Sequence, residues 1–154
     1  MDVYDLILES FLPLFYKGKY TEAIEILHQA WDGITDKNTQ ITEQIYIQSE
    51  LGRCYLELIK RSKGASEAEI FVKQASENFL AAYEQLSQLN DEVEKKEWEK
   101  TLRQGLRDID YLMKIGIPIS SRKNKKYTNH FFTAKLHSRR TLLQPYWQFS
   151  LFCQ

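Results

Sequence analysis

The side chains that could perform chemistry are few in this sequence, and they are not grouped. Cys54 and Cys153 are the only cysteines, and neither lies at a short metal-ligand spacing from another ligand. His28 stands alone in a helical pattern, and we interpret it as a packed or solvent-facing histidine. The sequence contains no nucleophile elbow, phosphate-binding glycine loop or acid–base constellation. We therefore expect no enzymatic activity, no catalytic residue, no metal and no cofactor.

The strongest charge pattern is the contrast between the two ends of the chain. Every Asp and Glu lies at or before Asp110, so residues 1–114 carry a net charge of −7 and residues 115–154 carry +7. The positions expected to make contacts in this tail are Arg122, Lys123, Lys125, Lys126, Arg139, Arg140 and, within a later aromatic segment, Trp147.

Four interpretations of this tail remain open. Basic residues among aromatic ones can neutralise phosphates and stack on bases, which favours nucleic-acid binding. They can also lie at an anionic membrane surface. Alternatively the tail folds back onto the acidic helices, which is the interpretation we rank first, or it derives from an alternative exon or reading frame without a selected function.

The composition predicts an all-α protein of about five antiparallel helices. The chain has 154 residues, and it contains only three prolines and six glycines. This length suits one domain, which we place at residues 1–114, followed by the basic, aromatic tail at residues 115–154. No apolar stretch is long enough to span a bilayer, and we expect a cytoplasmic or nuclear protein.

The first two helices are predicted from apolar spacing and from turn residues. A helix from Asp2 to about Lys17 should kink or break near Ser10–Leu12, because Pro13 cannot donate its backbone hydrogen bond. Gly18 should form the turn. A second helix, capped by Thr21, should run to Asp32 and end on a left-handed Gly33.

Three longer helices are predicted to follow. The third should span about Thr39–Arg61, and the fourth should open with a capping box from Ser66 to Glu69 and run to about Leu86. The fifth should be capped by Asn90 or a neighbour. Its inner stripe is expected to contain Val93, Trp98, Leu102, Leu106, Ile109 and Met113.

A spacing of small, large and small residues occurs in two of these helices. Ala23, Leu27 and Ala30 lie at i, i+4 and i+7, and so do Ala75, Phe79 and Ala82. Residues with this spacing share one helix face, and the small side chains allow a neighbouring helix to approach closely. The pattern therefore indicates a helical hairpin that occurs twice.

These positions resemble the tetratricopeptide-repeat pattern over about Ile7–Tyr83. The matching residues are Gly18, Tyr20, Ala23, Leu27 and Ala30 in the first unit, and Leu51, Gly52, Tyr55, Ala75, Phe79 and Ala82 in the second. The usual Trp, Leu and Gly of the first unit are replaced by Ile7, Ser10 and Phe11, and Gln48 replaces the Trp of the second. The second unit also contains about eleven extra residues, which longer helices would absorb.

The resemblance implies a partner-binding groove lined by the first helix of each unit. The corresponding positions are Leu8, Leu12, Phe15, Tyr46, Ser49, Arg53 and Leu56. Family members that clamp a peptide carboxylate use Lys and Asn there, so the two leucines argue against that activity. Arg53 is the one residue of this set suited to an anion.

The leading hypothesis is a non-enzymatic adaptor or scaffold that binds a peptide or partner helix. The alternative from another class is a nucleic-acid-binding protein that acts through the tail. A third hypothesis is a fragment or isoform of a longer helical array, because two units are few for such a solenoid. A homo-oligomer would supply the missing packing surface.

Overall fold

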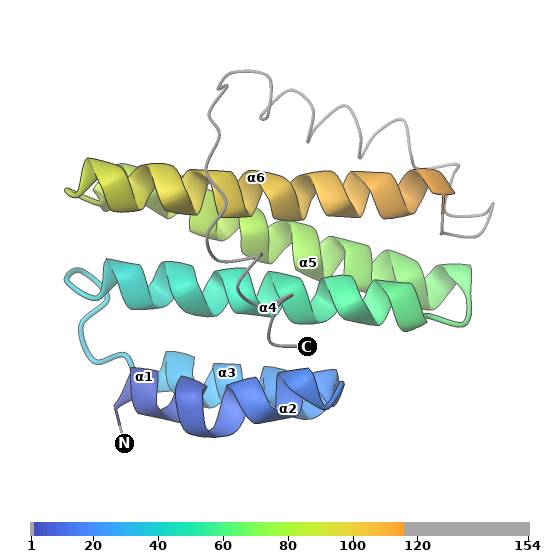
Figure 1. Ribbon diagram of the computed structural model, residues 1–154, viewed down its shortest axis with the longest axis horizontal. Helices are drawn as coiled ribbons and strands as arrows, with labels where there is room; N and C mark the ends of the chain where they lie inside the picture. Colours follow the sequence, from blue (N-terminus) through green and yellow to red (C-terminus); the bar gives the residue numbers. More distant parts are fainter. Residues whose placement is uncertain (1, 116–154) are drawn as a thin grey trace.

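The computed structural model describes residues 2–115, and within that range the chain folds into helices with no strand. Figure 1 shows these elements. In chain order they are α1 (Val3–Leu6), the π-helical turn η1 (Ile7–Phe11), α2 (Leu12–Tyr16), α3 (Tyr20–Asp32), α4 (Ile41–Arg61), α5 (Ala65–Gln85), the 3-10 turn η2 (Leu86–Gln88) and α6 (Glu92–Ile115). The all-α prediction is confirmed.

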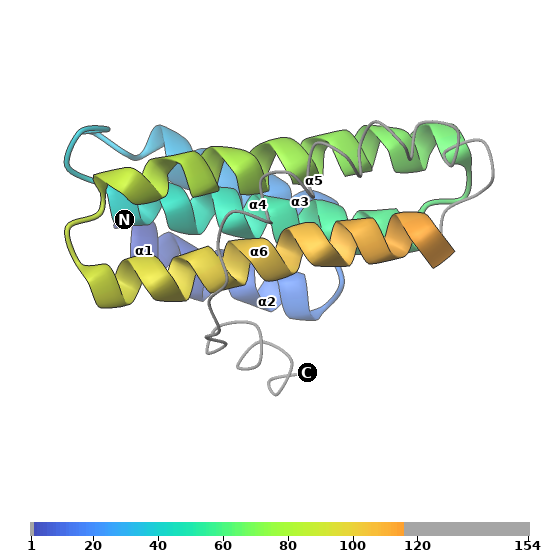
Figure 2. The ribbon, with the colours of Figure 1, turned by 90° about the horizontal axis from the view of Figure 1, so that it is seen from above.

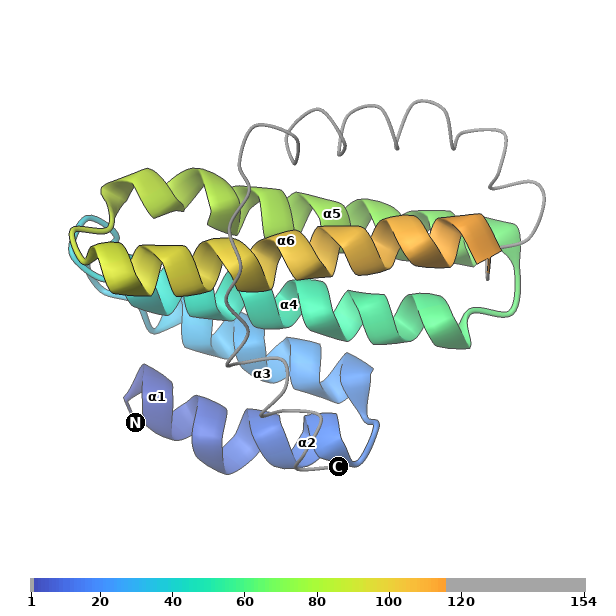
Figure 3. The same cartoon turned by 45° about the horizontal axis from the view of Figure 1, so that its top comes forward.

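The helices form successive antiparallel pairs around a central α4. The α1–η1–α2 helix pairs with α3, α4 pairs with α5, and α6 lies along both α4 and α5 (Figures 1 and 3). Viewed from above, α6 and α4 run in the same direction and α5 runs against them (Figure 2). Helices α4 and α6 therefore lie parallel to each other, whereas the first hairpin packs on α4 mainly through α3.

Pro13 explains the irregular first helix. Proline cannot donate the hydrogen bond of a regular helical turn and its ring crowds the preceding turn. The chain accommodates it with the π-helical turn Ile7–Phe11 directly before α2, in which Pro13 occupies the first turn. The irregularity expected near Ser10–Leu12 is this π-helical turn rather than a break, because the helix continues through it with Ile7 and Phe11 both buried.

Gly18 forms the turn of the first hairpin, as predicted. Its φ is +76°, a left-handed conformation that favours glycine. The Gly18 carbonyl accepts a 2.7 Å hydrogen bond from Nη1 of Arg61 at the end of α4. The Arg61 guanidinium also lies 4.5 Å from the centre of the Tyr20 ring, so the first hairpin is anchored to α4 at this point.

The second hairpin is longer than the first. Helices α4 and α5 have 21 residues each, whereas α3 has 13. The extra residues of this unit are thus accommodated in helix, as expected from the sequence. Longer helices bury a longer apolar stripe, and α4 contributes to core clusters on both of its sides.

The ring of Phe79 on α5 packs closely against two glycines, Gly52 on α4 and Gly105 on α6. A Cβ atom added to Gly52 would lie 2.6 Å from Phe79 Cε1, and one added to Gly105 would lie 2.6 Å from Phe79 Cζ. Only glycine leaves room for the ring at these two positions. Both small-large-small faces are buried, because each of Ala23, Leu27, Ala30, Ala75, Phe79 and Ala82 is at most 1% exposed.

Several helix ends differ from the predictions. Helix α3 begins at Tyr20 without a side-chain cap, so Thr21 does not cap it, and Gly33 has φ −75° rather than a left-handed value. Helix α5 begins at Ala65, one residue before Ser66, because the extended Gly64 is its N-cap. The predicted cap of α6 at or near Asn90 is Asp91, which accepts hydrogen bonds from two backbone N–H groups.

The inner stripe of α6 is confirmed with one exception. The buried residues are spaced as expected for a helix face that packs on α4 and α5. They are Trp98, Leu102, Leu106, Ile109 and Met113. Val93 was predicted in the same stripe, but it is exposed. It lies in the first turn of α6 and points to solvent, whereas the next residue, Glu94, contacts α4.

Candidate partner-binding face

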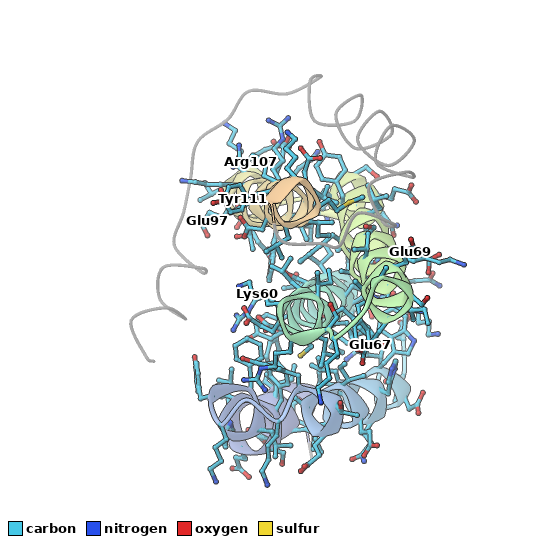
Figure 4. All side chains as sticks on the ribbon, turned by 90° about the vertical axis from the view of Figure 1, so that its right-hand side faces the viewer. Lys60, Glu67, Glu69, Glu97, Arg107 and Tyr111 are labelled. Atoms are coloured by element: carbon cyan, nitrogen blue, oxygen red, sulfur yellow. The ribbon has the colours of Figure 1, made fainter. Side chains whose placement is uncertain are left out.

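The first helices of the hairpins lie on one side of the molecule. Figure 4 looks along the helices and shows α4 and α6 adjacent where Lys60, Glu97 and Tyr111 are labelled, with α5 on the opposite side. The α1–η1–α2 helix continues this side beyond α4, and α3 lies behind it. We call the seven predicted binding positions on these helices the first-helix face. They are Leu8, Leu12, Phe15, Tyr46, Ser49, Arg53 and Leu56.

The seven residues differ in their access to a partner. Leu8 is 60% exposed, and Leu12 and Tyr46 are half-buried. Phe15, Ser49, Arg53 and Leu56 are buried. Leu56 belongs to the core cluster shared with α5 and α6, whereas Phe15 belongs to the cluster of the first hairpin. A partner could therefore reach Leu8, Leu12 and Tyr46, whereas the other four side chains are buried inside the protein.

Arg53 is engaged within the protein. Its Nη1 lies 3.1 Å from Oε1 of Glu50, one turn earlier on α4, and both side chains are at most 8% exposed. Its guanidinium also lies 4.1 Å from the centre of the Phe15 ring. The cation–π contact joins α4 to α2, and the ion pair within α4 holds the guanidinium in place. An anionic ligand would have to compete with Glu50 for this charge.

Burial changes the acid–base behaviour of this centre. Removal from water raises the pKa of Glu50 above its ordinary value of 4.5, although the neighbouring Arg53 acts in the opposite direction. The second carboxylate oxygen of Glu50 is buried, and no group within residues 2–115 donates a hydrogen bond to it. Burial also raises the pKa of the Cys54 thiol, which lies next to Arg53 in the sequence. A thiol that stays protonated is a poor nucleophile.

Polar and aromatic contacts hold α4 and α6 in register. Near their N-terminal ends, the Thr42 hydroxyl donates a 2.9 Å hydrogen bond to the carboxylate of Glu94. One turn later, the Tyr46 and Trp98 rings meet edge to face with centroids 5.8 Å apart. Tyr46 thus supports the first-helix face by its contact with α6 as well as by its partly exposed edge.

A second buried ion pair was not singled out from the sequence. Glu99 Oε1 and Arg103 Nη2 on α6 lie 3.2 Å apart, with side-chain exposures of 9% and 5%. The Tyr83 hydroxyl on α5 donates a 3.4 Å hydrogen bond to the same oxygen of Glu99. The available signal was the Glu-to-Arg spacing of four residues, which brings the charges together on a helix. The sequence alone does not show that such a pair is buried.

Neither a metal site nor a membrane-spanning helix is found among residues 2–115. No cluster of His, Cys, Asp and Glu in that range could hold a metal, and no helix there is long and apolar enough to cross a bilayer. The predicted tail contacts all lie outside the described residues, namely Arg122, Lys123, Lys125, Lys126, Arg139, Arg140 and Trp147.

Comparisons of this chain with protein-family models, with curated proteins and with solved structures gave no match.

Proposed function

We propose that this protein is a non-enzymatic adaptor of tetratricopeptide-repeat type that binds a partner helix or peptide on its first-helix face. The observation that carries the proposal is that α4 and α6 run parallel beside each other, and that α2 reaches α4 through the contact of Arg53 with Phe15. Helical hairpins stacked in this way present a continuous surface formed by several first helices. The small-large-small packing faces of α3 and α5 also support it.

The partner that fits this face is an amphipathic or apolar helix. Leu8, Leu12 and Tyr46 offer apolar contact area, and the exposed Tyr111 adds an aromatic side chain on α6. Such a partner would insert apolar residues at helical spacing, as in other helix-on-surface recognition. Because Arg53 is already paired with Glu50, an acidic residue of the partner contributes only where it displaces that carboxylate.

The direct experiment is to select amphipathic helical peptides that bind the full-length chain and to compare two matched variants. Leu8→Asp places a charge on the first-helix face, where Leu8 is 60% exposed. Ile70→Asp makes the same change on α5, where Ile70 is 61% exposed. Burying an apolar contact is worth about 1.5–3 kcal/mol per large side chain, so Leu8→Asp should weaken binding by roughly tenfold to a hundredfold.

Ile70→Asp should leave the affinity of the same peptides unchanged. Both substitutions replace an exposed apolar residue on a helix, so neither should alter the fold, which circular dichroism checks. If Leu8→Asp binds every selected peptide as the wild type does, the proposed function is wrong. If turnover of a substrate were found in the same preparations, the non-enzymatic part would be wrong as well.

A second candidate function rests on the charge of the tail. Residues 115–154 carry seven Lys and Arg residues and no Asp or Glu, a composition that favours phosphate contacts. Binding of RNA or DNA that weakens steeply with salt and disappears when Arg139 and Arg140 are replaced by Gln would support it. Binding that persists in those variants would count against it.

A further inference from the structure

The first helical segment, α1–η1–α2, follows a four-residue repeat. Every fourth residue is buried in the first hairpin, and the residue directly after each of these is at least partly exposed. The buried residues are Val3, Ile7, Phe11 and Phe15. The residues after them carry large apolar or aromatic side chains, and we call them the outer stripe. They are Tyr4, Leu8, Leu12 and Tyr16.

The π-helical turn keeps the outer stripe on one side of the segment. In a regular α-helix each fourth residue is rotated by about 40° from the one before, so a four-residue repeat winds around the axis. The wider turn Ile7–Phe11 offsets part of this rotation. Val3 and Phe15 are accordingly buried in the same cluster, and the residues that follow them lie on a common side. Within this stripe Leu8 is 60% exposed.

The outer stripe has the same order of side chains in both directions. A tyrosine stands at each end, and two leucines lie between them. When a second copy lies antiparallel with its Leu12 beside Leu8, its Tyr16 lies beside Tyr4. A two-fold dimer requires a self-complementary surface of this kind, because the same patch of both copies forms the interface. The order of side chains in the stripe therefore fits a second copy of this chain.

Charge favours the antiparallel orientation. Asp5 and Lys17 each directly follow a tyrosine of the outer stripe, so they lie on the same flank of it at opposite ends. Both residues are exposed, and neither takes part in an ion pair among residues 2–115. An antiparallel two-fold pair brings Asp5 of each copy close to Lys17 of the other, whereas a parallel pair brings like charges together. The same antiparallel pairing places Glu9 opposite Pro13, which has no charge.

From these observations we propose that the outer stripe is the interface of an antiparallel homodimer. Leu8 of each copy packs against Leu12 of the other at the centre, and pairs of Asp5 with Lys17 form at both ends. One helix from each copy makes a small interface, below the roughly 1,200 Å² of standard ones, so the dimer is transient. The proposal does not rest on the proposed function. Because both use Leu8 and Leu12, a bound peptide and a second copy exclude each other.

Analytical ultracentrifugation of the full-length protein, under reducing conditions and without peptide, tests this proposal. The weight-average mass should rise from that of a monomer towards that of a dimer between about 1 and about 500 μM, as expected for a micromolar dissociation constant. Leu8→Asp should raise that constant by at least about tenfold. Ile70→Asp makes the same change on α5, where Ile70 is 61% exposed, and should leave the constant unchanged.

Exchange of the two charges tests the orientation of the copies. Asp5→Lys and Lys17→Glu should each weaken the dimer by about tenfold, because each single change places like charges together at both ends. The double variant should recover the affinity of the wild type, since it restores opposite charges. A monomer at every concentration would overturn the proposal. So would a Leu8→Asp variant that dimerises as the wild type does, or a double variant no tighter than the single ones.

Discussion

At the centre of the first-helix face, the charge of Arg53 is balanced by Glu50 inside the protein. Removing one member of a buried ion pair leaves the other charge without compensation, whereas replacing both can be nearly neutral. We expect Arg53→Met to lower the free energy of unfolding by about 3–5 kcal/mol, and Glu50→Gln with Arg53→Met to recover most of that loss. Urea unfolding of the two single variants and the double variant measures the coupling. Additive effects would show that the 3.1 Å pair is energetically unimportant.

The raised pKa of Glu50 predicts a pH dependence of stability. Because its pKa in the folded state lies above the ordinary 4.5, the folded protein binds the proton more tightly than the unfolded chain does. The contribution of this group to stability is therefore present below 4.5 and is lost as the pH rises through the folded-state pKa. Urea midpoints measured upward from pH 4.5 should fall more steeply for the wild type than for Glu50→Gln. Parallel curves would contradict the assignment.

At the scale of the elements, the packing of α4, α5 and α6 depends on two glycines in helix interiors. Gly105→Ala should destabilise the protein by about 1–3 kcal/mol through overpacking against Phe79, less up to about 1 kcal/mol of improved helix propensity. Thermal unfolding measures the net effect, and adding Phe79→Leu should recover part of it. Gly64→Ala controls for steric crowding alone, because nothing lies within 4 Å of its added Cβ, and its effect is limited to the N-cap of α5. Equal melting temperatures for the wild type and Gly105→Ala would contradict the proposed close contact.

The long helices could be predicted from the sequence because their apolar spacing is regular. The faces around Leu27 and Phe79 are buried as expected, and the stripe from Trp98 to Met113 is correct. Helix starts were less predictable, since the N-cap depends on where the turn directs the chain. Gly64 in extended conformation starts α5 before Ser66 can cap it. Interior glycines were a usable signal, because an unexplained helix-interior glycine often marks a close approach.

The candidate site could be predicted only in part. The resemblance named seven positions for the first-helix face, and the structure leaves Leu8 exposed while it buries Phe15, Ser49, Arg53 and Leu56. It did not reveal that Arg53 pairs with Glu50 and stacks on Phe15, because that outcome depends on the distance between α2 and α4. The same limitation applies to the burial of Glu99 and Arg103, whose spacing is typical of exposed helix pairs as well.

At the scale of the whole molecule, the first and second helices have different roles. Helices α3 and α5 supply the small-large-small faces that hold the stack together, and in the proposed function α1–η1–α2, α4 and α6 would present the surface for a partner. A partner helix should therefore contact several first helices at once. Its footprint should cross hairpin boundaries rather than follow a single hairpin.

The most direct measurement is the hydrogen-exchange footprint of a selected peptide on the full-length protein. We predict slower exchange, by a factor of about ten at saturating peptide, in η1–α2, α4 and α6, with α3 and the exposed side of α5 around Ile70 unchanged. The footprint should be absent when Leu8→Asp is mixed with the same concentration of peptide. A footprint confined to α3 and α5, or one that Leu8→Asp leaves intact, would contradict a partner-binding face made by the first helices.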